Sequence, residues 1–157
     1  MKLIVNNPSA RGDEKGGDRQ NPTQAASREL DVHAFLLCDS VARDAQSGKT
    51  SIQGVFDTIY ATSFPAIHPT LATYFRLSFD EPQSAPVVVG LALTTPSGQR
   101  REDREAISVQ TGPSGILEAW INMPNFHFPE AGSYCFELLV NGEAVADYVL
   151  QAQLRTA

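Results

Sequence analysis

The chain has 157 residues, of which 42% are hydrophobic, enough to build the core of one domain. It carries 18 acidic and 12 basic residues, and a net charge of −6 disfavours nucleic acid as a partner because the phosphates would be repelled. No apolar run approaches the roughly 18 residues that span a bilayer, and the apolar start MKLIV is too short for the core of a signal peptide. We therefore expect a cytoplasmic protein that binds neither nucleic acid nor membrane.

The N-terminal region differs in composition from the rest of the chain. Residues 5–29 are rich in Gly, Pro, Asn, Ser and charged residues, with almost no large apolar side chains. Such a segment cannot bury enough apolar surface to offset the entropy lost on ordering. We expect a disordered tail over residues 1–30 and a folded domain over residues 31–157.

From residue 32 onward, short runs of Val, Ile, Leu, Phe and Tyr alternate with turn residues, and no stretch has a helical stripe. This pattern is typical of a sandwich or barrel. It predicts an all-β, immunoglobulin-like antiparallel β-sandwich of about eight strands. The expected strands are 32–39, 50–60, 70–80, 86–95, 103–110, 115–123, 132–140 and 143–152.

The last two expected strands form the strongest hairpin prediction. Asn141 and Gly142 separate them, and both residue types tolerate the positive φ of a two-residue type I′ turn. A regular register would then place Asp147 opposite Phe136, on the expected core face. Either a β-bulge reorients Asp147 or that end of the last strand is exposed.

The two cysteines, Cys38 and Cys135, belong to no zinc-type spacing. In a reducing compartment we expect two buried free thiols that act as small apolar residues. A disulfide between them would require neighbouring strands.

Three stretches of the sequence resemble a family of small bacterial proteins of unknown function. They are AFLLCDSV, then GKTSIQGVFDTIYATSFPAIHPTL, then PEAGSYCFELLVNGE, and the most specific part runs from Gly48 to Leu71. The resemblance covers about residues 33–152 and implies a single β-sandwich domain of bacterial origin. It implies no activity, so it assigns no catalytic residue.

The residues themselves show no catalytic or metal-binding pattern. There is no GxSxG motif, and the eleven-residue separation of His68 from Asp57 matches no catalytic spacing. His33, His68 and His127 are scattered, although folding could still bring ligands together. We expect no enzyme, no metal and no cofactor. Trp120 would be a sugar-stacking candidate if it lay on an outer face, whereas packing in the core or over an edge is the simpler expectation.

One end of the sandwich is the candidate contact surface. If all strands run antiparallel in turn, the connections 61–69, 96–102 and 124–131 lie at the same end, opposite the Asn141–Gly142 turn. We expect SFPAIHP to be a crossing loop, because Pro65 and Pro69 cannot donate hydrogen bonds to a sheet. Phe64 and Phe128 are expected to plug the core. The predicted partner-binding residues are Phe64, Ile67, His68, Arg100, Arg101, Phe126 and His127.

These features favour a non-catalytic protein-binding or adaptor module of the bacterial cytoplasm. Aromatic and arginine side chains are enriched at protein interfaces, and exposed strand edges bind partners or second copies of the same chain. A carbohydrate-binding module is the alternative, and a metal-dependent enzyme is the third hypothesis.

Overall fold

The structure is a computed structural model that describes residues 2–3, 30–102 and 106–156. Every regular element in these ranges is a β-strand, which confirms the all-β prediction; the predicted tail lies almost wholly outside them. The strands are β1 (Lys2–Leu3), β2 (Leu30–Arg43), β3 (Thr50–Val55), β4 (Thr58–Ala61), β5 (Ala66–His68), β6 (Ala72–Phe79), β7 (Val87–Thr94), β8 (Arg100–Glu102), β9 (Ile107–Val109), β10 (Ile116–Asn122), β11 (Phe126–Phe128), β12 (Gly132–Val140) and β13 (Glu143–Leu154).

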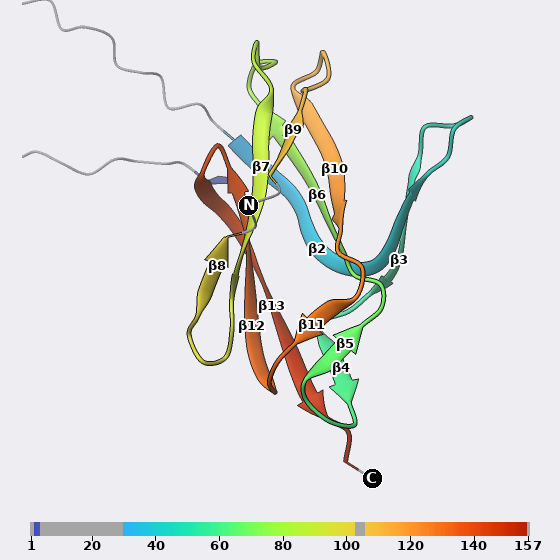
Figure 1. The fold of residues 1–157 in the computed structure, drawn as a ribbon. Helices are drawn as coiled ribbons and strands as arrows, with labels where there is room; N and C mark the ends of the chain where they lie inside the picture. Colours follow the sequence, from blue (N-terminus) through green and yellow to red (C-terminus); the bar gives the residue numbers. More distant parts are fainter. Residues whose placement is uncertain (1, 4–29, 103–105, 157) are drawn as a thin grey trace, which may run out of the picture.

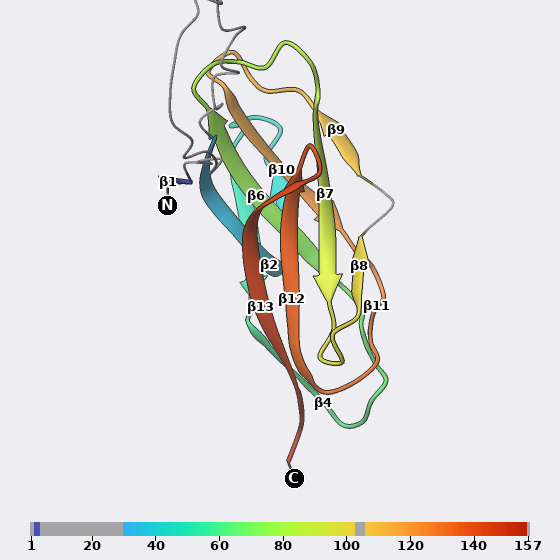
Figure 2. The same cartoon turned by 90° about the vertical axis from the view of Figure 1, so that its left-hand side faces the viewer.

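Two large sheets face each other, and a small ribbon lies at one end (Figures 1 and 2). The first sheet has the order β1-β2-β6-β10, with β3 also paired to β2. The second has the order β4-β13-β12-β7-β8, with β9 also paired to β7. The ribbon consists of β5 and β11. No helix in the described residues is long and apolar enough to cross a membrane.

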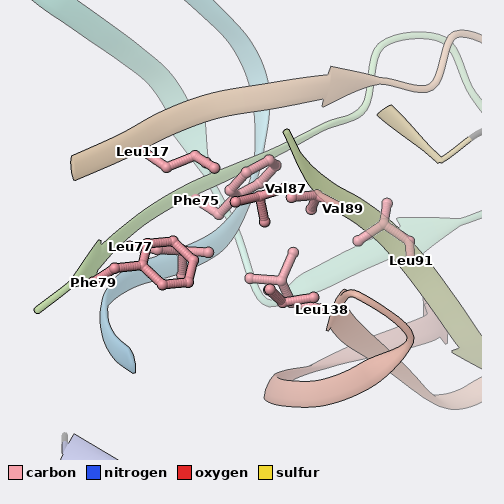
Figure 3. Close-up of a cluster of buried hydrophobic side chains, with 9 residues drawn as sticks. Phe75, Leu77, Phe79, Val87, Val89, Leu91, Leu117 and Leu138 are labelled. Carbon is pink, nitrogen blue, oxygen red and sulfur yellow. The ribbon is translucent and has the colours of Figure 1, made fainter. Parts of the chain in front are cut away.

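The core follows from the alternation of side chains along β6 and β12. On β6, Phe75 and Leu77 are fully buried, and β12 contributes the fully buried Leu138. Figure 3 shows these side chains meeting Val87, Val89 and Leu91 of β7 and Leu117 of β10. Full burial of such a side chain stabilises the fold by about 1.5–3 kcal/mol. A second cluster around Leu37, Phe128, Tyr134, Phe136 and Leu150 fills the other half of the sandwich.

The hairpin between β12 and β13 has the predicted turn and contains a bulge. Asn141 and Gly142 have φ of 49° and 85°, the two positive values that a type I′ turn needs. The register then shifts between Leu138 and Leu139, so that Asp147 pairs with Glu137 instead of Phe136. The bulge keeps the carboxylate of Asp147 off the core face.

The expected strand 50–60 is wrong as a single element. It divides at Phe56 and Asp57 into β3, which pairs with β2, and β4, which belongs to the other sheet. Gly54, with φ of +66°, allows the chain to turn out of the first sheet. β4 then pairs with β13 in parallel, which corrects the expectation that all strands are antiparallel.

The expected strand 103–110 is shorter in the structure, where only Ile107–Val109 is described as a strand, β9. β8 and β9 are separate strands that pair with opposite ends of the same edge of β7. Residues 103–105, within the predicted strand, lie outside the described residues.

Candidate functional site

The β5–β11 ribbon builds one end of the molecule. Phe126 pairs with His68, His127 with Ile67, and Phe128 with Ala66. Pro65 and Pro69 flank β5, and Pro124 and Pro129 flank β11, so neither three-residue strand can extend because proline has no N–H to donate. The prediction that SFPAIHP is only a crossing loop is therefore wrong: its three central residues form a strand.

A cleft of about 420 Å³ lies between β8 and β11 and is called the end cleft here. Its floor is apolar, and Arg101 and His127 are exposed side chains on its wall. The lining comprises Leu91, Ala92, Leu93, Arg101, Glu102, Met123, Phe126, His127 and Phe136. A second hollow of about 310 Å³ shares Leu93, Arg101 and His127 and extends toward Ser97 and Glu130.

Arg100 and Arg101 belong to opposite faces of β8. Arg101 pairs with Leu93, and Leu93 pairs with the core residue Phe136, so Arg101 continues the inward-facing row. Arg100 lies on the outer face, where it forms ion pairs with Glu102 at 2.5 Å and Glu137 at 3.1 Å. Arg101 forms no ion pair with any residue in the described ranges, so its guanidinium is available to a ligand.

The phenylalanines around the end cleft differ in their exposure. Phe128 is fully buried and packs edge-on to Tyr134 at 5.0 Å between ring centroids. Phe64 is half-buried against the second core cluster. Both therefore plug the core, as expected. Phe126 is half-buried in the end cleft, and Ile67, 58% exposed, stands outside it on the ribbon.

His68 faces a different hollow from His127. Its Nε2 lies 3.2 Å from Oδ1 of Asp39, and its ring lies 5.0 Å from that of Phe56. These residues line a shallow hollow of about 320 Å³ with Tyr60 and Arg155. His68 and His127 are thus neighbours in the ribbon without sharing one binding pocket.

Tyr134 holds the loop beside the end cleft. Its hydroxyl donates to the carbonyl of Glu130 at 2.6 Å and accepts from the N–H of Glu130 at 3.1 Å. Burial raises the pKa of the Tyr134 phenol, so the hydroxyl stays protonated and keeps this donor. The wall next to His127 is therefore anchored to the core.

The three connections predicted to meet do meet, for a partly different reason. Segments 61–69 and 124–131 contain the paired strands β5 and β11, and the 96–102 connection reaches the same end through the hollow shared by Arg101 and His127. The Asn141–Gly142 turn lies at the opposite end (Figure 2). Simple alternation of eight strands does not describe the path, because the chain changes sheets between β3 and β4.

Sequence reasoning missed Asp39, Leu93, Met123 and Phe136 as part of this end. Asp39 lies 29 residues from His68, and no local spacing links them. Leu93 and Phe136 have clear strand patterns, but only the pairing of β7 with β12 places them beneath Arg101.

Trp120 lies on the outer face of the first sheet, paired with Tyr74, so of the two expected placements the core is wrong, whereas a place at the edge agrees with β10 being an edge strand. The ring is half-buried, and the guanidinium carbon of Arg43 lies 5.7 Å from its centroid. Arg43 also donates to Glu118 at 2.9 Å, and Arg76 donates to the same carboxylate at 2.5 Å. Trp120 is therefore part of a tied network rather than an open platform.

Other candidate chemistry is sparse in the part of the chain that the structure describes. No three His, Cys, Asp or Glu side chains gather there in a way that would hold a metal ion. Cys38 is buried and Cys135 half-buried, and both are free thiols. Burial raises the pKa of each thiol, which disfavours the reactive thiolate.

Comparison with protein families assigns the chain. The model of a family of unknown function, DUF6941, matches residues 33–153. The protein belongs to this family. The match agrees with the sequence resemblance over residues 33–152, and the family carries no described activity. No curated protein sequence matches this DUF6941 member.

Solved structures with a similar arrangement of strands are distant from this DUF6941 protein. The alkylpurine DNA glycosylase AlkC of Pseudomonas fluorescens aligns at 14% identity and TM-score 0.48, over 79% of this chain and 30% of its own. The C-terminal domain of wzt aligns at 11% identity and TM-score 0.46, over 82% and 74%. An immunoglobulin-like protein from Pseudomonas aeruginosa aligns at 14% identity and TM-score 0.38, over 82% of this chain and 99% of its own. This chain spans under a third of the glycosylase.

Proposed function

We propose that this protein is a non-catalytic binding module that holds a segment of a partner protein in the end cleft. The observation that carries the proposal is that Arg101, which has no ion pair among the described residues, lies beside an apolar floor. Arg101 and His127 stand above Leu93, Met123, Phe126 and Phe136 in one cleft. The partner segment would supply an apolar side chain for the floor and a carboxylate for Arg101.

The physical basis is the difference between the two arginines of β8. An arginine that is already paired gains little from a new carboxylate, whereas an unpaired one on an apolar wall offers a bidentate donor beside a desolvated surface. Arginine and aromatic residues of this kind carry much of the binding energy in protein interfaces. The exposed Ile67 extends the apolar surface along the ribbon.

The test is a quantitative pull-down from bacterial lysate with three versions of the tagged protein. The double variant Arg101→Ala with His127→Ala should lose a reproducible protein partner, and the recovered partner should bind wild-type protein by calorimetry. Arg100→Ala is the matched control, because Arg100 lies on the same strand but faces away. It should retain the partner, and the melting temperatures of all three should agree within a few degrees.

Two results would contradict the proposal. One is the absence of any reproducible partner for the wild-type protein. The other is equal loss of the partner in the Arg100→Ala control, which would show that overall charge, not the cleft, drives binding. His68→Ala separates the two hollows: we expect it to retain the partner, because His68 faces Asp39 and not the end cleft.

The carbohydrate-binding alternative requires an exposed aromatic platform. The aromatic candidate from the sequence, Trp120, is partly covered by Arg43. A glycan array with the wild-type protein checks this alternative directly, and we expect no binding.

A further inference from the structure

One edge of β2 is paired at both ends and vacant between them. β1 pairs with β2 at Leu30 and Asp31, and β3 pairs with it from Cys38 to Arg43. Both occupy the edge opposite β6 and both run antiparallel to β2. Over residues 32–36, no described strand pairs with that edge. The edge of β2 opposite β6 thus has a neighbouring strand at each end and, between them, a gap of about five residues.

Alternate residues in the gap direct their backbone groups to the edge away from β6. Leu37 accepts a hydrogen bond at its carbonyl from the N–H of Phe56, on the edge where β3 pairs. Successive residues direct their backbone groups to opposite edges of a strand, so Phe35 presents its N–H and C=O on the same edge as Leu37. No described residue pairs with these groups, so an added strand can do so.

Part of the edge of β13 also has no paired strand. β4 pairs with β13 only from Gln151 to Leu154, so residues 143–150 have an edge that no described strand occupies. The edges of β2 and β13 border a groove of about 800 Å³, called the side groove here. Its lining is Val32, His33, Ala34, Phe35, Leu36, Cys135, Glu137, Ala144, Val145, Ala146 and Asp147. β2 and β13 run next to each other in Figure 2.

The apolar residues of the side groove are less buried than their neighbours. Phe35 packs against both core clusters but is only half-buried, whereas Phe75, its partner on β6, is fully buried. Val32 and Val145 are half-buried as well. An added strand would cover these side chains and complete the edge of the core.

The charge of the side groove determines which kind of partner segment can bind there. Asp147 is exposed on the groove wall and makes no ion pair within the described ranges. The neighbouring carboxylate of Glu137 is paired with Arg100, so the unbalanced charge belongs to Asp147. A basic side chain complements it, and an acidic one is repelled.

We propose that the side groove is a strand-addition site for an extended segment of a partner protein that alternates apolar and basic residues. The segment runs antiparallel to β2, in the gap between β1 and β3. Backbone hydrogen bonds to Phe35 hold it, apolar side chains cover Phe35 and Val145, and a basic side chain meets Asp147. This site is separate from the end cleft and does not depend on it.

The test uses the full-length protein and a fluorescein-labelled heptapeptide, VKVTVKV. We expect saturable binding by fluorescence anisotropy. The peptide VKVPVKV should bind at least tenfold more weakly, because a central proline breaks the strand, and VEVTVEV should bind at least tenfold more weakly because of its charge. Hydrogen exchange by NMR should show the Phe35 amide unprotected in the free protein and protected in the complex.

Matched variants on β13 localise the binding. Ala144→Trp fills the side groove and should weaken VKVTVKV at least tenfold. Val149→Trp places the same bulk at an exposed position outside the groove and should leave the affinity within twofold. Asp147→Lys should reverse the preference for VKVTVKV over VEVTVEV, whereas Glu143→Lys, on the same strand but outside the lining, should not.

Three outcomes would overturn the proposal. The first is equal affinity for VKVTVKV and VKVPVKV, or no binding of either. The second is an equal effect of Ala144→Trp and Val149→Trp. The third is protection of the Phe35 amide in the free protein, which would show that the chain itself fills the groove. In that case the groove is filled either by a second copy of the protein or by another segment of the same chain. Sedimentation at several concentrations, with and without Ala144→Trp, distinguishes the two, because only a second copy makes the mass depend on concentration.

Discussion

At the scale of single residues, Thr73 is a polar side chain buried among apolar ones. It lies on the core face of β6 and is fully buried, and its hydroxyl has no hydrogen-bond partner among the described residues. A buried polar group without a partner keeps its desolvation cost and gains nothing in return.

Thr73→Val should therefore stabilise the protein by up to about 1 kcal/mol. Chemical denaturation of the two proteins under identical conditions measures the difference. A destabilisation would show that the hydroxyl has a bonded partner, such as an ordered water.

Gly54 is required by both its backbone conformation and its neighbour. Its φ is +66°, and a Cβ there would clash with Oδ2 of Asp39. Gly48 has nearly the same φ, +68°, but no described residue has an atom within 4 Å of the position that a Cβ would take. The pair separates the cost of positive φ from the cost of the contact.

Gly48→Ala should cost about 1 kcal/mol from the backbone alone, and Gly54→Ala should cost more. We also expect Gly54→Ala to displace the Asp39 carboxylate from His68, which a change in the NMR chemical shifts of the His68 ring at constant pH would detect. Equal costs for the two variants would mean that Asp39 moves aside freely.

At the scale of elements, Glu118 ties the β2–β3 hairpin to β10. It accepts hydrogen bonds from Thr50 and Arg43 of the hairpin and from Arg76 of β6. Burial alone would raise the pKa of this carboxyl, but the hydrogen bonds outweigh burial and lower the pKa from 4.5 to about 2. The charged form is therefore favoured in the folded protein.

A lowered folded pKa means that the contribution of Glu118 is complete above pH 4.5 and is lost as the pH falls toward 2. Glu118→Gln should destabilise the protein at pH 7 by up to about 3 kcal/mol. The difference in the free energy of unfolding between wild type and variant should decrease as the pH falls from 4.5 toward 2. Urea unfolding followed by circular dichroism at several pH values measures it, and a difference that does not change with pH would contradict the assigned role.

At the scale of the whole molecule, the two sheets build their core from residues after the N-terminal region. Both buried clusters lie between residues 37 and 152, and β1 contributes a two-residue pairing at the edge of β2. The linings of the end cleft and the side groove lie between residues 32 and 147.

Deleting residues 1–29 should therefore leave the melting temperature within a few degrees of the full-length value. Calorimetry of the two proteins checks it. A larger fall would show that the N-terminal region packs on the sandwich beyond the contact of β1.

The sequence by itself determined the fold class, most of the strands and the turn at Asn141–Gly142. These depend on local chemistry: alternation assigns Phe75, Leu77 and Phe136 to one face each, and positive φ selects residues for the turn. The same alternation exposed the conflict at Asp147, which a bulge resolves. Pro65 and Pro69 likewise marked the break between β4 and β6 correctly, although not the short strand β5 between the two prolines.

Only the tertiary structure decided which residues share a site. Arg100 and Arg101 are adjacent in sequence, but the pairing of β8 with β7 directs one to Glu137 and the other to the end cleft. The split of the 50–60 segment, the parallel pairing of β4 with β13 and the gap along β2 arise in the same way. All of them depend on pairing between strands far apart in the chain, and local propensity carries no information about which distant edge a strand will meet.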